Sequence, residues 1–416
     1  MKRCEITLAL ALLVLPAASF SQELPRATPE SVGLSSEALA LVTERLQAHI
    51  DDGDIAGVVA GVMRRGRLVY FESLGQIDLE SARPMPDDAI FRQYSMTRPI
   101  TSLAAMILWE EDAFELDDAV SMYLPQFVNQ RVFTDARNAS MDATKSRTTE
   151  MTVEHLLLHT SGMGSRSSGI YRQEGVRLRS ITLEQMVDNA ARTPLFEDPG
   201  TQWRYGISTT ILGRLVEIWS GQPLEDFMQE RIFEPLGMTD SGFWADPSRA
   251  DRLATVYRPG DDGRLRPHAI EEIPFTERPT LIEGGVGLLT STRDFLRFSQ
   301  MFLNGGELDG NRVLQPETVA LMTVNRVPDA LLPISNRSPG RGWSLGFAVV
   351  MDAETHPGFT VSDNEFWWDG SAGTRFHIDP ELDIVTVINA QVSPAGGNGF
   401  REEFKTLVYA AILEGR

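Results

Sequence analysis

Thiols are almost absent from this sequence, which has one cysteine in 416 residues. That residue, Cys4, lies before an apolar run at residues 6–15. The remaining chain therefore has no thiol for a disulfide or a cysteine nucleophile. Long apolar runs are also missing, because no later stretch reaches the ~20 residues needed to span a bilayer. We expect no membrane insertion by the mature chain.

Lysine is scarce too. Lys2, Lys145 and Lys405 are the only lysines among 38 basic residues, and 58 acidic residues give a net charge of −20. Such a surface repels nucleic acid and anionic lipid, so neither is an expected partner. No low-complexity tract suggests disorder. The composition favours a soluble globular protein of one large two-part domain or two closely packed ones.

The N-terminus has the pattern of a signal peptide. Lys2 and Arg3 precede the apolar run, which is too short to span a bilayer, and a small-x-small cleavage site ends at Ser21. We expect residues 1–21 to be a signal peptide and the protein to be periplasmic or secreted. A retained N-terminal anchor is the alternative.

Periodicity predicts strands near both ends of the chain and helices between them. The expected helices lie near residues 36–50, 99–108, 294–302 and 400–413, and the expected strands at 55–63, 68–74, 284–290, 344–351, 374–378 and 383–390. The predicted fold class is α/β of the α+β type: an antiparallel sheet built from N- and C-terminal segments and flanked by helices, with an inserted, mostly helical domain. The expected boundaries are 28–114 and 266–416 for the sheet domain and 115–265 for the helical domain.

One candidate nucleophile is a decoy. Gly342-Trp343-Ser344-Leu345-Gly346 matches the nucleophile elbow of α/β-hydrolases, which needs a strand before the serine and a helix after it. Here a loop precedes Ser344 and a strand pattern follows it. We therefore do not assign the nucleophile to Ser344.

Metal and nucleotide sites are not expected. His155 and His159 are spaced as in zinc proteases, but Leu156 occupies the position of the required glutamate. The glycines at 284–287 lack the lysine of a phosphate loop. We predict two structural histidines, no metal and no cofactor.

Residues 91–100 hold the strongest candidate. A helix that begins near Ser95 would place the serine hydroxyl at the positive end of the helix dipole, with Arg98 on the same face. The backbone N–H of Ser95 would be free to bind an oxyanion. A serine that only caps a helix is the alternative.

The chain from about residue 28 resembles the serine β-lactamase and penicillin-binding superfamily, and looks closest to the class C-like family VIII carboxylesterases. Segments in the family's order carry the resemblance: residues 91–100, 155–163, 199–205, 233–238, 284–298 and 368–380. The resemblance implies Ser95 as nucleophile, Tyr205 as base, and the backbone N–H groups of Ser95 and Ser371 as the oxyanion hole. It implies an acyl-enzyme formed from a small ester or amide.

Arg98 and Asp369 depart from the family pattern. Arg98 stands where the family has a lysine, and a guanidinium cannot give up its proton to act as a base. It can still stabilise a phenolate at Tyr205 by its charge. Asp369 stands where the family has a small residue. We hypothesise an Arg98–Asp369 ion pair; the alternative is that Asp369 points to solvent.

The substrate contacts are also inferred from the resemblance. Ile207 replaces a polar residue that helps β-lactamases to hold the lactam amide, so ester hydrolysis is favoured over lactam hydrolysis. We expect four substrate-binding residues: Trp368, Asp369, Gly370 and Trp343. An apolar acyl pocket could be lined by four tryptophans, Trp203, Trp343, Trp367 and Trp368.

Three functions remain open from the sequence. The first is a serine hydrolase, esterase or acyltransferase acting through Ser95. The second is an inactive binding homologue, because Arg98 has removed a proton acceptor. The third is a non-hydrolytic enzyme in which Arg98 clamps a substrate carboxylate.

Overall fold

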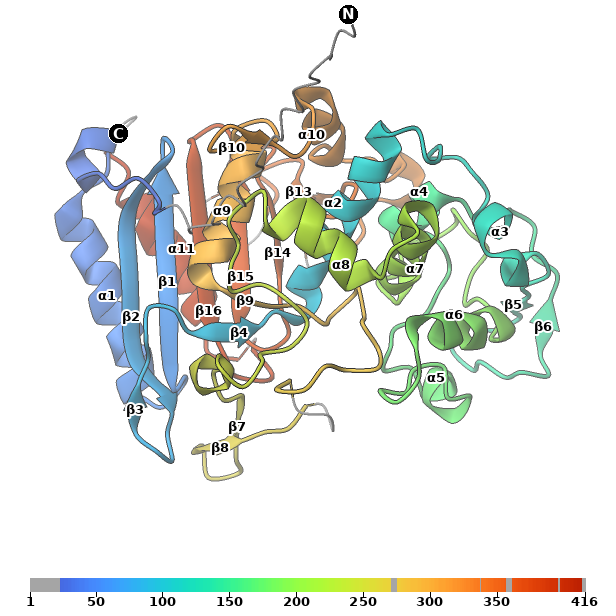
Figure 1. Ribbon diagram of the computed structural model, residues 1–416, viewed down its shortest axis with the longest axis horizontal. Helices are drawn as coiled ribbons and strands as arrows, with labels where there is room; N and C mark the ends of the chain where they lie inside the picture. The colour runs from blue at the N-terminus through green and yellow to red at the C-terminus, as the bar shows by residue number, and fades with distance from the viewer. Residues whose placement is uncertain (1–22, 271–274, 337, 357–360, 396, 414–416) are drawn as a thin grey trace, which may run out of the picture.

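The computed structural model describes residues 23–270, 275–336, 338–356, 361–395 and 397–413. The predicted signal peptide, with Cys4, lies outside the described residues. Figure 1 shows one large sheet with helices on both faces and a mostly helical region beyond one end. Within the described residues, no helix combines the length and the apolar character needed to cross a membrane.

The sheet has eight strands, all antiparallel to their neighbours. In spatial order they are β12 (Arg341–Trp343), β13 (Ala348–Val350), β14 (Phe366–Asp369), β15 (Thr374–Asp379), β16 (Ile384–Ala390), β1 (Gly57–Arg64), β2 (Arg67–Asp78) and β3 (Arg83–Pro84). The N-terminal hairpin β1–β2 joins the C-terminal strands where Gly61 faces Val387. The predicted sheet of N- and C-terminal segments, and with it the fold class, is confirmed.

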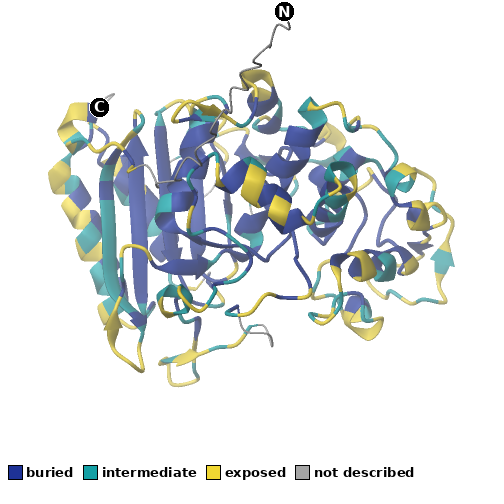
Figure 2. Ribbon diagram, viewed as in Figure 1, coloured by how far each residue is buried: buried dark blue, intermediate teal, exposed yellow. Residues whose placement is uncertain are grey.

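The side chains of β1 point alternately to the two faces of the sheet, and each face is covered by its own layer of the core. Val58, Ala60 and Val62 pack with the apolar sides of α1 (Ser36–Asp51) and α11 (Phe400–Ala410). The helix α9 (Thr292–Leu303) packs on β1, β15 and β16 from the other face. A strand's side chains alternate between faces, so each core strand contributes to both layers. Figure 2 shows the result, buried strands between helices whose outer faces are exposed.

The helical region lies beside α2 (Thr97–Glu110), which packs against α7. Its helices are α3 (Val120–Tyr123), α4 (Val153–Leu157), α5 (Gly169–Gln173), α6 (Leu183–Arg192), α7 (Ser208–Ser220) and α8 (Leu224–Met228). Helix α7 ends at Ser220 and is followed by Gly221, whose φ of +70° suits the left-handed cap position. The remaining α-helix, α10 (Pro316–Met322), follows α9.

Four short strand pairs complete the described structure. They are β4 (Ile90–Arg92) with β9 (Leu289–Ser291), β5 (Val132–Phe133) with β6 (Thr144–Lys145), β7 (Tyr257–Pro259) with β8 (Leu265–Pro267), and β10 (Glu307–Leu308) with β11 (Asn311–Arg312). The strand predicted at 284–290 is therefore mostly a turn and loop, and only its end enters β9. The strand predicted at 344–351 begins only at Ala348, because Ser344 to Phe347 form the tight turn between β12 and β13.

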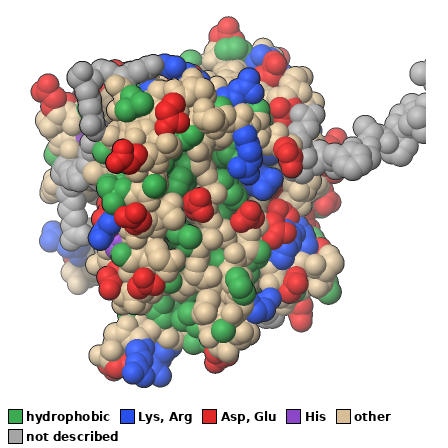
Figure 3. All heavy atoms as spheres, turned by 90° about the vertical axis from the view of Figure 1, so that its left-hand side faces the viewer, with side chains coloured by type: hydrophobic (Ala, Val, Ile, Leu, Met, Phe, Trp, Pro, Cys, Tyr) green, Lys and Arg blue, Asp and Glu red, His purple; other side chains and the backbone are tan. Residues whose placement is uncertain are grey.

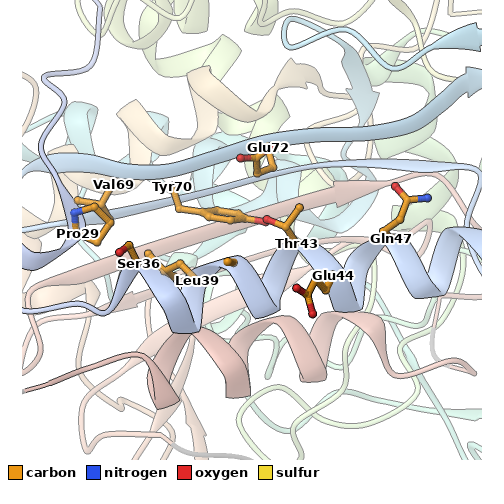
Figure 4. A pocket seen from close by; sticks show the side chains of 10 residues that line it. Pro29, Ser36, Leu39, Thr43, Glu44, Gln47, Val69, Tyr70 and Glu72 are labelled. Atoms are coloured by element: carbon orange, nitrogen blue, oxygen red, sulfur yellow. The ribbon is translucent and has the colours of Figure 1, made fainter.

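The surface away from the helical region has mixed charge. Figure 3 shows acidic, basic and apolar side chains interspersed on the face that carries α1. A groove runs there between α1 and β2, where Thr43 and Tyr70 share a 3.1 Å hydrogen bond (Figure 4). Three strands separate β2 from β14, the strand that carries Trp368 and Asp369.

Candidate active site

Ser95 lies in a strained turn between β4 and α2. Tyr94, directly before it, is buried and has a φ of +46°, a conformation that non-glycine residues rarely adopt. Residues Tyr94–Met96 form a turn of 3-10 helix and α2 begins at Thr97, between the predicted helix start at residue 99 and the start near Ser95 that the nucleophile argument considered. The half-buried Ser95 still sits at the N-terminal end of the helix, as expected.

Thr97 holds this turn in place. Its hydroxyl donates to the carbonyl oxygen of Tyr94 at 2.6 Å and accepts from the N–H of Leu288 at 3.0 Å. Gln93 donates its N–H to the carbonyl of Leu288 at 2.9 Å. These bonds tie both sides of Ser95 to the segment leading into β9, which explains how the strained φ of Tyr94 is maintained.

Arg98 lies one helical turn beyond Ser95 and is only 5% exposed. Its guanidinium carbon is 4.2 Å from the ring centroid of Tyr205, and its Nη1 donates to Thr209 Oγ1 at 3.0 Å. Its Nε is buried and makes no hydrogen bond to any residue that the structure describes. Burial lowers the pKa of Arg98, whereas its interaction with Tyr205 raises it. Arginine keeps its proton through such shifts, so the site contains a buried cation against a phenol.

Tyr205 is placed by the loop that leads into α7. Gly206 permits this path, because a Cβ there would come within 2.4 Å of the carbonyl oxygen of Gly164. Arg204 donates its N–H to the carbonyl of His159 at 2.8 Å. The His159 ring centroid lies 4.7 Å from that of Tyr205, and burial holds the pKa of His159 well below its usual value. A neutral imidazole therefore supports the phenol from one side.

Trp368, at the end of β14, contacts Tyr205 directly. Its indole Nε1 donates to the phenolic oxygen at 3.0 Å, and the two ring centroids are 5.2 Å apart. Trp203 stacks on Tyr205 with the ring centroids 6.1 Å apart. Trp343 meets Trp368 edge-on, with the ring centroids 4.5 Å apart. Three of the four tryptophans considered from the sequence thus surround the phenol.

Trp343 and Trp367 differ in how they relate to this cluster. Trp343 is fully buried, and its Nε1 donates to the carbonyl of Leu157 at 3.1 Å. Trp367 lies on the opposite face of β14 from Trp368 and packs against Arg375 and His377. A pocket lined by both neighbours, Trp367 and Trp368, is inconsistent with the alternation of a strand.

The hypothesis of an Arg98–Asp369 ion pair is wrong. Asp369 pairs instead with Arg375 at 3.1 Å, its cross-strand neighbour on β15, and with Arg401 of α11 at 3.5 Å. Its side chain is only 31% exposed, so it does not point freely into solvent. It also lies on the other face of the sheet from Arg98. The cause is again strand alternation, which points Trp368 toward Tyr205 and Asp369 toward α11.

Gly370 and Ser371 begin the turn between β14 and β15. A Cβ on Gly370 would lie 2.4 Å from the carbonyl oxygen of Gln93, so this turn approaches the nucleophile segment closely. Ser371 is exposed. Within the described parts of the chain, neither the N–H of Ser95 nor that of Ser371 donates to a protein acceptor. Both groups are thus available to an added oxyanion.

The rejected motifs have structural roles. Ser344 is buried in the β12–β13 turn, where its N–H donates to Phe347, and no helix follows. His155 accepts the N–H of Thr152 in a capping box of α4, and His159 lies beyond that helix. Over the described residues, no three acidic, histidine or cysteine side chains are grouped as metal ligands.

Sequence reasoning missed several neighbours of the site. Thr209 and Arg166 both interact with Arg98, and Arg166 also lies 5.8 Å from the ring of Tyr94. Gln391 contacts the segments on both sides of the presumed oxyanion hole. None of these residues belongs to a local pattern. Thr209 lies in the first turn of α7, four residues after the predicted Tyr205, but that separation alone did not mark it.

The chain is similar to known proteins over most of its length. The family model described as "Beta-lactamase" matches residues 42–409. The chain is 33% identical over 353 residues to Protein Rv1367c of Mycobacterium tuberculosis, covering 83% of this chain and 88% of that protein. It is 28% identical to Esterase EstB of Burkholderia gladioli, covering 89% and 95%. A solved structure of "EstCE1, a hydrolase with promiscuous acyltransferase activity" superimposes with a TM-score of 0.78 at 27% identity, covering 91% and 99%.

Proposed function

The chain belongs to the β-lactamase family and is a serine hydrolase or acyltransferase, and from this premise we propose that it transfers acyl groups from small esters through Ser95, with Tyr205 as the base and Arg98 as a fixed cation. The observation that carries the proposal is the guanidinium of Arg98, 4.2 Å from the ring centroid of Tyr205. In the proposed mechanism Tyr205 accepts the proton of Ser95, and the positive charge of Arg98 beside its ring stabilises the base during that step.

Acylation follows from these assignments. Ser95 Oγ attacks the ester carbonyl and gives its proton to Tyr205, while the N–H groups of Ser95 and Ser371 bind the oxyanion. The tetrahedral adduct collapses, the ester C–O bond breaks, and Tyr205 returns the proton to the departing alkoxide. The products are an alcohol and an acyl ester on Ser95.

Deacylation uses the same groups. Water or a second alcohol attacks the acyl ester while Tyr205 takes its proton, and Ser95 leaves as the hydroxyl by taking that proton back. Arg98 keeps its proton throughout. Water yields hydrolysis and an alcohol yields acyl transfer, and the relatives include both an esterase and a hydrolase with acyltransferase activity.

The aromatic surroundings support an ester with an apolar acyl group. Trp203, Tyr205 and Trp368 form a cluster in which Trp203 and Tyr205 are partly exposed. Such surfaces bind apolar groups by removing them from water. The β-lactam amide is a poorer candidate, because Ile207 offers no polar side chain to hold it.

A chromogenic short-chain ester and a fluorophosphonate probe test the proposal. We expect the protein to hydrolyse the ester and to gain the mass of one phosphonyl group, with Ser95→Ala abolishing both. Ser344→Ala, which alters the decoy serine, should leave both in place. Turnover that survives in Ser95→Ala would refute the nucleophile assignment. Absence of turnover and labelling in the wild type would instead fit the binding homologue.

We also propose that residues 1–21 direct the chain out of the cytoplasm. The positive start, the short apolar run and the cleavage site at Ser21 support this proposal. N-terminal sequencing of protein recovered from cell fractions tests it. A mature N-terminus near residue 22 in a periplasmic or culture fraction is expected, and full-length protein confined to the cytoplasm would contradict export.

A further inference from the structure

Gln391 is a buried side chain between the two segments that supply the oxyanion N–H groups. It follows β16 directly and is 5% exposed. Its own carbonyl accepts the N–H of Tyr257 at 2.8 Å, which fixes the backbone from which the side chain extends. The side chain amide therefore occupies a defined place.

On one side the amide binds the strand that leads to Ser95. Gln391 Oε1 accepts the N–H of Arg92 at 3.0 Å, and Nε2 donates to the carbonyl of Arg92 at 3.3 Å. The amide thus pairs with both backbone groups of Arg92, as a neighbouring strand would. On its other edge, Arg92 lies in register with Leu289. The strand end three residues before Ser95 is held from both sides.

On the other side the amide reaches the turn after β14. Nε2 also donates to the carbonyl of Ala372 at 3.4 Å and to that of Ala390 at 2.9 Å. Ala372 follows Ser371 directly and accepts a second bond from the N–H of Val392 at 2.9 Å. One side chain therefore joins the segment before the nucleophile to the turn that carries the second oxyanion N–H.

We propose that Gln391 is a positioning residue that sets the separation of the Ser95 and Ser371 N–H groups. This inference rests on the proposed function. Gln391 touches no reacting atom, and it acts through Arg92 and Ala372. Oxyanion stabilisation depends on donors fixed at hydrogen-bond distance from the developing charge, so a shift of one segment against the other weakens it.

Gln391→Met tests the proposal, because it keeps a side chain of similar length and removes every amide bond. Gln130→Met is the matched control. Gln130 is also 5% exposed, and its Nε2 donates to two carbonyls, those of Ala190 and Thr193, within the helical region. Both variants remove a buried amide that binds backbone carbonyls, four hydrogen bonds at Gln391 and two at Gln130, and only Gln391 lies beside the oxyanion donors.

The measurement compares a p-nitrophenyl ester with its thiono analogue, in which sulfur replaces the carbonyl oxygen. Sulfur accepts hydrogen bonds poorly, so the ratio of the two kcat/KM values reports the oxyanion hole and does not depend on the fraction of active enzyme. We expect Gln391→Met to lower kcat/KM for the oxygen ester about 10- to 100-fold, with a smaller loss for the thiono ester and hence a lower ratio. Gln130→Met should keep the wild-type ratio.

An unchanged ratio in a folded Gln391→Met protein would overturn the proposal. Gln391→Asn, one methylene shorter and still polar, serves if the methionine variant does not fold, and the same ratio decides the outcome. Wild-type turnover that depends on Ser95, together with unchanged ratios in Gln391 variants, would reject only this inference. Turnover that persists in Ser95→Ala would reject the proposed function itself.

Discussion

The indole of Trp368 donates its N–H to the phenolic oxygen of Tyr205 at 3.0 Å. In the proposed mechanism this hydrogen bond orients the Tyr205 oxygen for proton transfer, and a hydrogen bond to a charged acceptor contributes about 1.5–3 kcal/mol. Trp368→Phe keeps a ring and removes the donor. We expect kcat/KM for an ester to fall about 10- to 100-fold.

Trp219→Phe is the control for that substitution. Trp219 lies on α7, stacks on Phe114 and meets the ring of Tyr123 edge-on, away from Tyr205. Steady-state kinetics on both variants, with circular dichroism to verify folding, make the measurement. Equal losses in the two variants would mean that the Trp368 indole N–H has no special relation to catalysis.

Substitution of Arg98 separates charge from proton transfer. Arg98→Met removes the cation beside Tyr205, and we expect kcat/KM to fall about 100-fold because general-base catalysis is lost. Arg98→Lys restores a cation that can titrate, and it should retain activity with an altered pH–rate profile. Profiles of kcat/KM from pH 5 to 10 provide the measurement. Full activity in Arg98→Met would remove Arg98 from the mechanism.

Asp369 balances two buried arginines on the far face of β14. Asp369→Ala would leave Arg375 and Arg401 without this carboxylate, and we expect the free energy of unfolding to fall by about 1–3 kcal/mol. Glu307→Ala breaks the more exposed pair with Arg312 and should leave the urea midpoint nearly unchanged. Equal midpoints for the two variants would show that the Asp369 pairs do not stabilise the fold.

The error at Asp369 shows which information the sequence carried. Hydrophobic periodicity was sufficient to predict the fold class and most of the strands at both ends. Neighbouring motif residues were assumed to share one side of the site, yet Trp368 and Asp369 occupy opposite faces of one strand. To assign these two residues correctly, one must know which face of β14 packs toward Tyr205. Only the packed sheet gives this information.

Gln391 illustrates a second kind of missing information. Glutamine has no characteristic spacing, and its partners Arg92 and Ala372 come from distant parts of the sequence. Arg166 was missed for the same reason. Ser95, Arg98 and Tyr205 were found because motifs mark them, and the structure brings Arg98 against Tyr205.

The buried carboxyl of Asp294 should make the free energy of unfolding depend on pH. Burial, and then the charge of Asp240, raise the pKa of this carboxyl to about 7, although it accepts bonds from the Asp240 N–H and Ser241. Between about pH 4 and 7 the folded state retains a proton that the unfolded state has lost, so stability decreases as pH rises. The slope reaches at most about 1.4 kcal/mol per pH unit.

Asp294→Asn should therefore reduce the difference in unfolding free energy between pH 5 and pH 8. Asp246→Asn is the control, because hydrogen bonds from Ser248 lower the pKa of Asp246 to about 2, below this window. Urea denaturation at both pH values makes the comparison. A wild-type protein equally stable at pH 5 and pH 8 would contradict the prediction.

The pairing of Gly61 with Val387 affects biosynthesis. The ribosome releases the β1–β2 hairpin long before its partner strand has been translated, and until then one edge of β1 remains open. Pairings between such distant segments slow folding and prolong exposure of apolar surface. The nascent chain therefore needs the C-terminal strands, which are translated last, to complete its sheet. Until then, the open edge of β1 is accessible to chaperones.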